Sequence, residues 1–272
     1  MQQKSIVFIG GGNMAQAIIF GLLSKGYPAQ LINVCDRNPS KLALFAHKEV
    51  AIEQDKEKAL QQAEVVVLAV KPQAMAETCA EFASAVDFSD KLVISIAAGI
   101  SCARLAQLLP SAQAIIRVMP NTPALVSEGM TGLFATEQVN LPLKQFAQQL
   151  FSAVGQICWV DDEQQMHHIT AAAGSSPAYF FLFMEAMAQA LADSGLEPEQ
   201  IRLLIQQSAL GAAKMVVDNP QLSLSQLREN VTSKGGTTAA ALQVFQQHQF
   251  TQQVQQAMQA CIARSQQMEK QF

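Results

Sequence analysis

The chain has 272 residues, of which 50% are hydrophobic and 15% are charged, with a formal net charge of −4. This length and apolar content provide for a large buried core in one or two domains. The negative net charge and the scattered lysines and arginines argue against a basic surface, so we expect neither nucleic acid nor a membrane as a partner.

Nothing in the composition predicts secretion, membrane insertion or a metal site. The N-terminus leads directly into an apolar strand pattern, without the regions of a signal peptide. The longest apolar run, residues 177–187, is interrupted by Glu185 and is too short to span a bilayer. Five cysteines without a CxxC pair are typical of core residues in a reducing compartment. The adjacent His167 and His168 would point apart on a helix. We therefore expect a cytoplasmic protein without metal.

The first part of the chain shows the pattern of a parallel α/β sheet, because short apolar runs alternate with amphipathic stretches from Lys4 to about Val160. Strands are predicted at residues 5–9, 31–35, 65–70, 92–96, 114–118, 132–135 and 156–160, and helices at 13–24, from 39 onward and at 143–151.

Beyond Asp161 the strand pattern stops and helical periodicity follows, at residues 177–194, 198–218, from 223 and after 239. Polar residues form only a narrow stripe along residues 177–194, so we expect that helix to be buried nearly all round, in the centre of an oligomer. The chain is predicted to be an α/β protein. Residues 1–161 form a Rossmann-like dinucleotide-binding domain, and residues 162–272 form an all-α dimerisation domain.

A glycine-rich segment, residues 10–15, follows the first strand and opens a helix, as a dinucleotide fingerprint does. In the pattern G-x-G-x-x-A, Gly10 makes the tight turn, Gly12 lets a pyrophosphate approach the backbone and Ala15 permits close packing of the helix. Asn13 and Met14 lie between them. The alternative is a purely structural turn, but the position directly after the leading strand favours a nicotinamide dinucleotide.

The end of the second strand gives mixed signals about the cofactor. An acid at the position of Asp36 normally accepts the ribose hydroxyls of NAD, whereas an arginine such as Arg37 accommodates a 2′-phosphate. Asp36 would repel that phosphate unless Arg37, with Lys56, outweighs it. We favour NADP(H), with NAD(H) tolerated.

Two further segments lie where open α/β sheets bind ligands. Lys71 and Pro72 end the third strand, and we assign Ala69 and Val70 beside them to the same cofactor site. The alternative is an ordinary strand exit. Asn121, after the fifth strand, offers a polar group toward the cleft.

Residues 231–239, VTSKGGTTA in one-letter code, have the composition of an anion-binding loop. Paired glycines tolerate positive φ and let backbone N–H groups converge, and the following helix adds its free N–H groups and the positive end of its dipole. The alternative is a simple helix start with Thr237 or Thr238 as the N-cap.

With these segments in order, the sequence resembles the pyrroline-5-carboxylate reductase family. The resemblance spans residues 6 to about 246 and rests on residues 9–15, 68–73, 119–124, 174–179 and 231–238, the last being the family's most specific signature. The family more often has glycine in place of Ser176 and proline in place of Lys234, and many members have asparagine near Lys56.

The resemblance implies hydride transfer from NAD(P)H to the C=N bond of 1-pyrroline-5-carboxylate, which gives L-proline in the final step of proline biosynthesis. It also implies that the helical domains of two subunits interlock, with a pocket that combines one chain's nucleotide domain with its partner's helices. The expected assembly is a homodimer at least, and some members of the family form decamers.

The same resemblance assigns substrate binding to the glycine loop. The N–H groups of Gly235, Gly236 and Thr237 would clamp the substrate carboxylate. Thr238 would hydrogen bond the ring nitrogen and relay a proton, although a threonine hydroxyl is a poor acid by itself. The remaining pocket residues implied are Asn230, Val231 and Ser233.

Two other functions compete with this one. Hydroxyacid dehydrogenases and other imine reductases share the two-domain plan. The dehydrogenases carry a catalytic lysine after a glycine, which Gly211 and Lys214 imitate, but Asp218 replaces the asparagine expected four residues later, and those enzymes lack the GGTT loop. A non-catalytic dinucleotide-sensing protein would need the cofactor fold without a working second site, and the intact loop counts against it.

Overall fold

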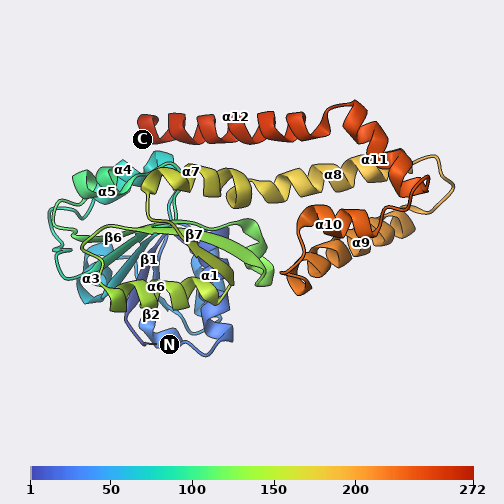
Figure 1. Cartoon of the computed structure of the whole chain (residues 1–272). Coiled ribbons are helices and arrows are strands. Elements are labelled where there is room, and N and C mark those ends of the chain that lie inside the picture. The colour runs from blue at the N-terminus through green and yellow to red at the C-terminus, as the bar shows by residue number, and fades with distance from the viewer. Residues whose placement is uncertain (1) are drawn as a thin grey trace. The chain divides into compact units, whose positions relative to one another are not determined.

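The computed structural model describes residues 2–272 (Figure 1). The chain divides into two compact units, one of Met1–Pro177 with Ala260–Phe272 and one of Ala178–Gln259. We call them the sheet unit and the helical unit. Across residues 2–272, each helix is too short or too polar to cross a lipid bilayer.

The sheet unit contains one eight-stranded sheet in the order β3-β2-β1-β4-β5-β6-β7-β8. Neighbouring strands run parallel except for β6 and β7. The chain crosses between β1 and β4, which is the switch point where such sheets bind ligands. The strands are β1 (Ile6–Ile9), β2 (Ile32–Cys35), β3 (Ala51–Ile52), β4 (Val65–Leu68), β5 (Leu92–Ser95), β6 (Ala114–Met119), β7 (Gly129–Ala135) and β8 (Gly155–Trp159).

Helices cover both faces of this sheet. On one face lie α1 (Asn13–Ser24), α2 (Pro39–Ala46) and α6 (Leu141–Ser152), and on the other α3 (Lys56–Gln62), α4 (Met75–Ala80) and α5 (Cys102–Leu108). The central strands are buried on both sides, as Val7 and Phe8 show, with 0% exposure on opposite faces. This explains why they are continuous apolar runs in the sequence. The predicted Rossmann-like fold is confirmed.

The sheet differs from the predicted one in two respects. It includes β3, an exposed two-residue edge strand that is too short to give a sequence pattern. It is also not entirely parallel, because β7 runs antiparallel to β6. Only a loop with a 3₁₀ turn over Thr122–Val126 joins these two strands. That connection is shorter than the crossover that a parallel strand needs.

Helices follow β8 to the end of the chain. They are α7 (Met166–Ile169), a π-helical turn (Thr170–Gly174), α8 (Ser176–Ala190), α9 (Pro198–Asp218), α10 (Leu224–Asn230), α11 (Thr237–Gln247) and α12 (Phe250–Gln271). The last residues of α12 belong to the sheet unit. The division at residue 161 follows the change from strands to helices and stays a proposal, because the compact units are defined by contacts instead.

The helical unit buries few apolar side chains of its own, with Ile201 and Ile205 on α9 at 7% and 6% exposure. Phe183, Phe245 and Phe250 pack together with ring centroids 5.3–6.3 Å apart, but each stays 40–43% exposed. Much of the remaining apolar surface of α8 is exposed in the single chain, including Phe180 (64%), Phe181 (62%) and Leu182 (65%). The predicted burial of this helix is therefore not achieved within one chain, and its apolar face is left for another subunit.

Candidate functional site

The glycine turn after β1 is held between the ends of two neighbouring strands. Gly10 has φ +106°, and a Cβ atom there would lie 2.6 Å from the carbonyl oxygen of Ala69, closer than real Cβ contacts come. Its N–H donates to the carbonyl of Cys35 at 2.8 Å. A residue with a side chain would clash at this position, so the tight turn predicted here needs glycine.

The start of α1 offers open space to a ligand. Gly12 is the N-cap residue, and a Cβ atom built on it meets nothing within 4 Å. Asn13 and Met14 form the first turn, where N–H groups have no partner in the helix. Ala15 is 1% exposed and packs into the core. This cradle fits a pyrophosphate, although the individual assignments stay predictions.

The carboxylate of Asp36 is turned toward the backbone. It accepts hydrogen bonds from the N–H groups of Gly11 at 2.7 Å and Asn38 at 2.8 Å, with Lys41 Nζ at 3.4 Å. Burial alone would raise the pKa of Asp36, but these hydrogen bonds and the Lys41 charge outweigh it, and its pKa lies below the ordinary value. Asp36 thus fixes the middle glycine of the turn, a contact that sequence reasoning missed because it links residues far apart in the chain.

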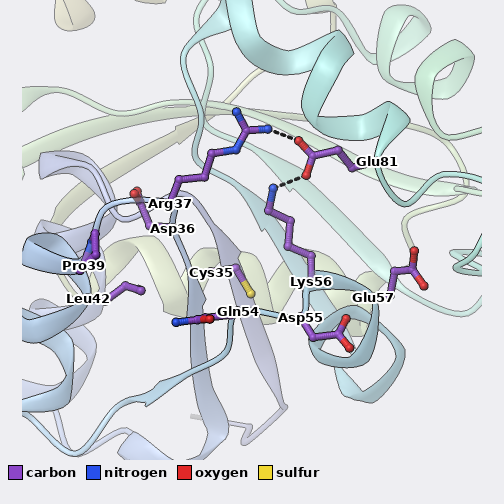
Figure 2. Close-up of a pocket in the computed structure, with 10 residues that line it drawn as sticks. All are labelled: Cys35, Asp36, Arg37, Pro39, Leu42, Gln54, Asp55, Lys56, Glu57 and Glu81. Carbon is purple, nitrogen blue, oxygen red and sulfur yellow. Dashed lines mark hydrogen bonds and ion pairs between the residues drawn. The ribbon is translucent and has the colours of Figure 1, made fainter.

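A cavity of about 600 Å³ opens at the end of β2, lined by Asp36, Arg37, Lys56 and Glu81, among others (Figure 2). Both cations contact the carboxylate of Glu81: the guanidinium of Arg37 contacts Oε1 and the ammonium of Lys56 contacts Oε2. Arg37 also lies 3.5 Å from Glu77. The structure therefore brings together the two cations predicted to bind a 2′-phosphate.

The segment after β4 lies beside the glycine turn. Val70 lines a smaller cavity with Gly10, and that cavity shares Arg37 and Lys56 with the larger one. The following Lys71 is exposed, and Pro72 begins a 3₁₀ turn. These residues lie at the edge predicted for the cofactor.

The side chain of Asn121 bonds to the backbone of other segments, whereas the sequence predicted that it would offer a polar group toward the cleft. It is 7% exposed, its Nδ2 donates to the carbonyl of Ala173 at 3.0 Å, and its Oδ1 accepts from the N–H of Met130 at 2.8 Å. The side chain joins the loop after β6 to β7 and to the π-helical turn, rather than facing an open cleft. Contact between Asn121 and a cofactor stays a prediction, and its side-chain amide is already engaged.

The predicted substrate loop lies in the helical unit, between α10 and α11. Gly235 has φ +75°, in the left-handed region that glycine adopts more easily than other residues. Gly236 is the N-cap of α11, so the alternative interpretation, with Thr237 or Thr238 as the capping residue, is wrong. A Cβ atom on Gly236 would lie 2.4 Å from the hydroxyl of Ser233, so any larger residue would force that hydroxyl to move.

The first turn of α11 presents hydrogen-bond donors at the loop. The N–H of Gly236 already donates to the carbonyl of Ser233 at 3.0 Å, whereas the first intrahelical bond is made by Ala240. The N–H groups of Thr237 and Thr238 therefore point out of the helix start. Both threonines are exposed, as are the other predicted pocket residues Asn230, Val231 and Ser233.

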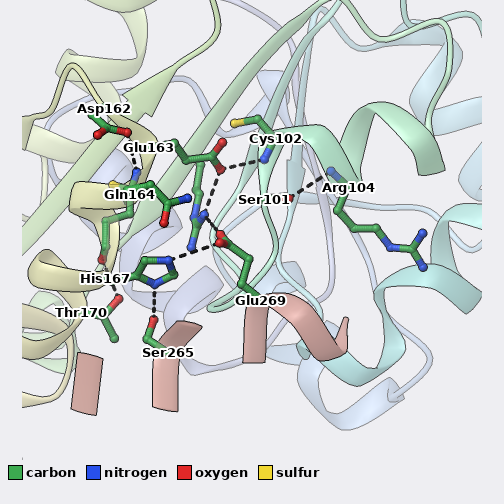
Figure 3. Close-up of polar contacts among 12 residues, drawn as sticks. Ser101, Cys102, Arg104, Asp162, Glu163, Gln164, His167, Thr170, Ser265 and Glu269 are labelled. Atoms are coloured by element: carbon green, nitrogen blue, oxygen red, sulfur yellow. Dashed lines mark hydrogen bonds and ion pairs between the residues drawn. The ribbon is translucent and has the colours of Figure 1, made fainter. Parts of the chain in front are cut away.

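A buried polar cluster in the sheet unit was not predicted (Figure 3). Arg117 on β6 is 3% exposed and contacts the carboxylates of Glu163, at 2.9 Å, and Glu269. His167 lies between Ser265, 2.9 Å from Nδ1, and Glu269, 3.2 Å from Nε2. Its members come from distant parts of the chain, so no local sequence pattern reveals it.

The cysteine at the end of β2 is buried. Cys35 is 2% exposed, and burial, with the nearby Glu53 charge, raises the pKa of its thiol to about 11. Cys35 is therefore a neutral thiol at physiological pH, without the thiolate character of a reactive cysteine.

A doubly wound sheet with a glycine turn at its switch point, joined to a helical unit, defines a two-domain oxidoreductase that uses a nicotinamide dinucleotide. The profile described as pyrroline-5-carboxylate reductase dimerisation matches residues 163–268, and that described as NADP oxidoreductase coenzyme F420-dependent matches residues 5–99. The chain belongs to the pyrroline-5-carboxylate reductase family. Its dimerisation domain makes it a homo-oligomer.

Individual relatives match this chain over its full length. The chain is 62% identical to pyrroline-5-carboxylate reductase from Pasteurella multocida and 61% identical to that from Haemophilus influenzae, covering 100% of both chains in each case. Among solved structures, a pyrroline-5-carboxylate reductase from Coxiella burnetii matches with TM-score 0.92 and 40% identity, covering 98% of this chain and 99% of that one. Plasmodium falciparum pyrroline carboxylate reductase with NADP bound matches with TM-score 0.87 and 27% identity, covering 99% of each.

Proposed function

We propose that this chain reduces the C=N bond of 1-pyrroline-5-carboxylate to give L-proline, the final step of proline biosynthesis. The observation that carries this function is full-length family membership, with relatives above 60% identity. All five cysteines are free, which fits a reducing compartment, and we place the enzyme in the cytoplasm.

The glycine turn and the start of α1 are proposed to hold the dinucleotide. The open side of Gly12 lets the pyrophosphate reach the backbone, and the N–H groups of Asn13 and Met14 donate to it with the help of the helix dipole. Ala69, Val70, Lys71 and Pro72, after β4, border the nicotinamide side of the same site. When bound, the reduced nicotinamide supplies the hydride for the imine carbon.

We propose that NADPH is preferred and NADH is also used. Each carboxylate oxygen of Asp36 already accepts a backbone hydrogen bond, one from Gly11 and one from Asn38, so less of its acceptor capacity is left for a cofactor ribose. Arg37 and Lys56 lie at the neighbouring cavity and supply two positive charges for a 2′-phosphate.

The loop before α11 is proposed to hold the substrate. The N–H groups of Thr237 and Thr238 donate to the carboxylate, and the N–H of Gly235 joins them from the left-handed turn. Gly236 contributes mainly by shape, because its N–H is already bonded to Ser233. Asn230, Val231 and Ser233 complete the pocket around the ring.

Thr238 is the proposed catalytic residue. Its hydroxyl hydrogen bonds the ring nitrogen and orients the C=N carbon for hydride attack, which is easiest when the imine is already protonated. A threonine hydroxyl does not ionise near neutral pH, so its contribution is positioning the ring and passing on a proton from water. The reaction then needs no protein nucleophile.

We propose a homodimer as the minimum functional assembly, with decamers as a higher assembly that needs a second interface between dimers. The exposed apolar side chains of α8 support this, because clustered exposed apolar surface marks sites of protein–protein contact. Analytical ultracentrifugation distinguishes the two assemblies, and a folded monomer would contradict both.

Oxidation of NADPH and NADH, followed separately after addition of pyrroline-5-carboxylate, tests the function directly. A folded dimer that oxidises neither cofactor would contradict it and favour a dinucleotide-sensing protein. Thr238→Ala should lower kcat at least tenfold, while Lys214→Ala should leave kcat unchanged. The hydroxyacid dehydrogenase alternative requires the opposite result, because its catalytic lysine would correspond to Lys214.

A further inference from the structure

Glu81 holds the two cations of the cofactor cavity together. It follows α4, and its two carboxylate oxygens contact different partners, the guanidinium of Arg37 from the end of β2 and the ammonium of Lys56 from the start of α3. Figure 2 shows the three side chains converging from three separate elements. The side chains of Lys56 and Glu81 are 17% and 34% exposed, whereas that of Arg37 is 69% exposed, so the Lys56 half of the bridge is the part shielded from solvent.

The Glu81 carboxylate contacts Arg37 and Lys56 in the way that a bound phosphate would. A phosphate monoester on a ribose binds arginine and lysine through separate oxygens, as Glu81 does here. It carries a charge of about −1.5 to −2 near neutral pH. A 2′-phosphate that reaches Arg37 and Lys56 must therefore displace the Glu81 carboxylate or lie beside it at a cost in repulsion.

Other acids line the same cavity, but they are placed differently. Asp36 is bonded to backbone N–H groups, and Glu57 lies apart from the bridge in Figure 2. Asp55 caps α3 by accepting from the N–H of Lys58. Among these acids of the cavity, Glu81 is the one that contacts both Arg37 and Lys56.

We propose that Glu81 is a specificity-determining residue of the cofactor site, which occupies the 2′-phosphate position in the unbound chain and reduces the preference for NADPH over NADH. NADH leaves the bridge intact, whereas NADPH gains Arg37 and Lys56 only by displacing Glu81 or by overcoming its repulsion. The inference rests on the proposed use of both cofactors and explains how a cavity with two cations remains open to NADH.

The test measures binding by titration calorimetry, with 2′,5′-ADP and 5′-AMP as probes that differ in the 2′-phosphate. Glu81→Gln keeps the size of the side chain and removes its charge. We expect it to bind 2′,5′-ADP about fivefold more tightly than the wild type, while its affinity for 5′-AMP changes less than about twofold. Glu57→Gln, the matched charge removal in the same cavity, should change both affinities less than about twofold.

Unchanged or weaker binding of 2′,5′-ADP to Glu81→Gln would overturn the proposal, as would an equal gain for both probes. An equal gain for 2′,5′-ADP in Glu57→Gln would also overturn it, because net charge alone would then explain the effect. Denaturation midpoints of the variants verify that they are folded. Failure of the reductase assay contradicts the proposed function, whereas these binding results bear on Glu81 alone.

Discussion

Arg117, which is buried, and Glu269, which is partly buried, form an ion pair between β6 and the last turns of α12, across 152 positions of sequence. The same Arg117 nitrogen, Nη1, donates to Glu163 at 2.9 Å. Nearby, Nε of Arg104 donates to the carbonyl of Phe272 at 2.7 Å. The end of α12 is therefore attached to the sheet unit by charge and by hydrogen bonds.

Replacement of Arg117 should strongly destabilise the protein. Arg117→Met keeps the side chain long but leaves two carboxylates, Glu163 and Glu269, without their cation. We expect the free energy of unfolding to fall by about 3–5 kcal/mol. Urea denaturation at a fixed protomer concentration measures the change, since an oligomer's stability depends on concentration.

The matched control is Arg264→Met, which removes an exposed arginine from α12, the helix that carries Glu269. It should change the free energy of unfolding by less than about 0.5 kcal/mol. Equal effects of the two substitutions would show that Arg117 contributes no more to the free energy of unfolding than an exposed arginine does.

The stability contributed by Glu269 should disappear in acid. Burial alone would raise the pKa of this carboxyl, but the hydrogen bond and charge of Arg117, with His167, outweigh it and hold its pKa below the ordinary 4.5. A folded-state pKa that is depressed gives stability that is present above the unfolded pKa and lost as pH falls through the folded one.

Glu269→Gln tests this dependence. The difference in the free energy of unfolding between the wild type and Glu269→Gln should shrink as pH is lowered from about 6 to about 3. Thermal or urea denaturation at several pH values measures it. A difference that stays constant over this range would show that Glu269 titrates alike in the folded and unfolded chains.

The most accurate predictions from the sequence concern single helices and strands, because these depend on the pattern of neighbouring residues. The helix predicted at residues 13–24 coincides with α1, and the buried strands were found because parallel strands covered on both faces are continuous apolar runs. The β6–β7 reversal was missed because strand direction depends on the length of the connection, not on the strand residues. The bond from Gly11 to Asp36 and the Arg117 cluster were missed because each joins distant segments.

Gly12→Ala should separate cofactor binding from stability. A Cβ atom at Gly12 meets no protein atom within 4 Å, so the variant should fold normally, but the methyl group would stand where the pyrophosphate approaches. We expect the Kd for NADPH to rise more than about tenfold, an increase above 1.4 kcal/mol, with an unchanged denaturation midpoint.

Gly21→Ala on the same helix provides the contrasting variant. Its Cβ atom would lie 2.2 Å from the Val154 side chain, so it should lower the midpoint instead. Normal NADPH affinity in Gly12→Ala would refute the placement of the pyrophosphate at this turn.

Gly236→Ala should weaken substrate binding through Ser233. The added Cβ atom would lie 2.4 Å from the Ser233 hydroxyl, which must rotate away from the position proposed for substrate contact. We expect KM for pyrroline-5-carboxylate to rise several-fold while the Kd for NADPH is unchanged. Steady-state kinetics and calorimetry measure the two effects.

Gly211→Ala is the control for that substitution, since its Cβ atom would meet nothing within 4 Å and it lies inside α9. Alanine favours a helix interior by about 1 kcal/mol over glycine, so this variant should be slightly more stable with an unchanged KM. An unchanged KM in Gly236→Ala as well would contradict the role given to the loop.

Because residues 260–272 complete the sheet unit after the helical unit has intervened, the order of synthesis matters for folding. A nascent chain that has reached only Pro177 contains the whole sheet but lacks Glu269, one of the two carboxylates that neutralise Arg117. The sheet unit therefore gains the Arg117–Glu269 ion pair only after the helical unit has been synthesised.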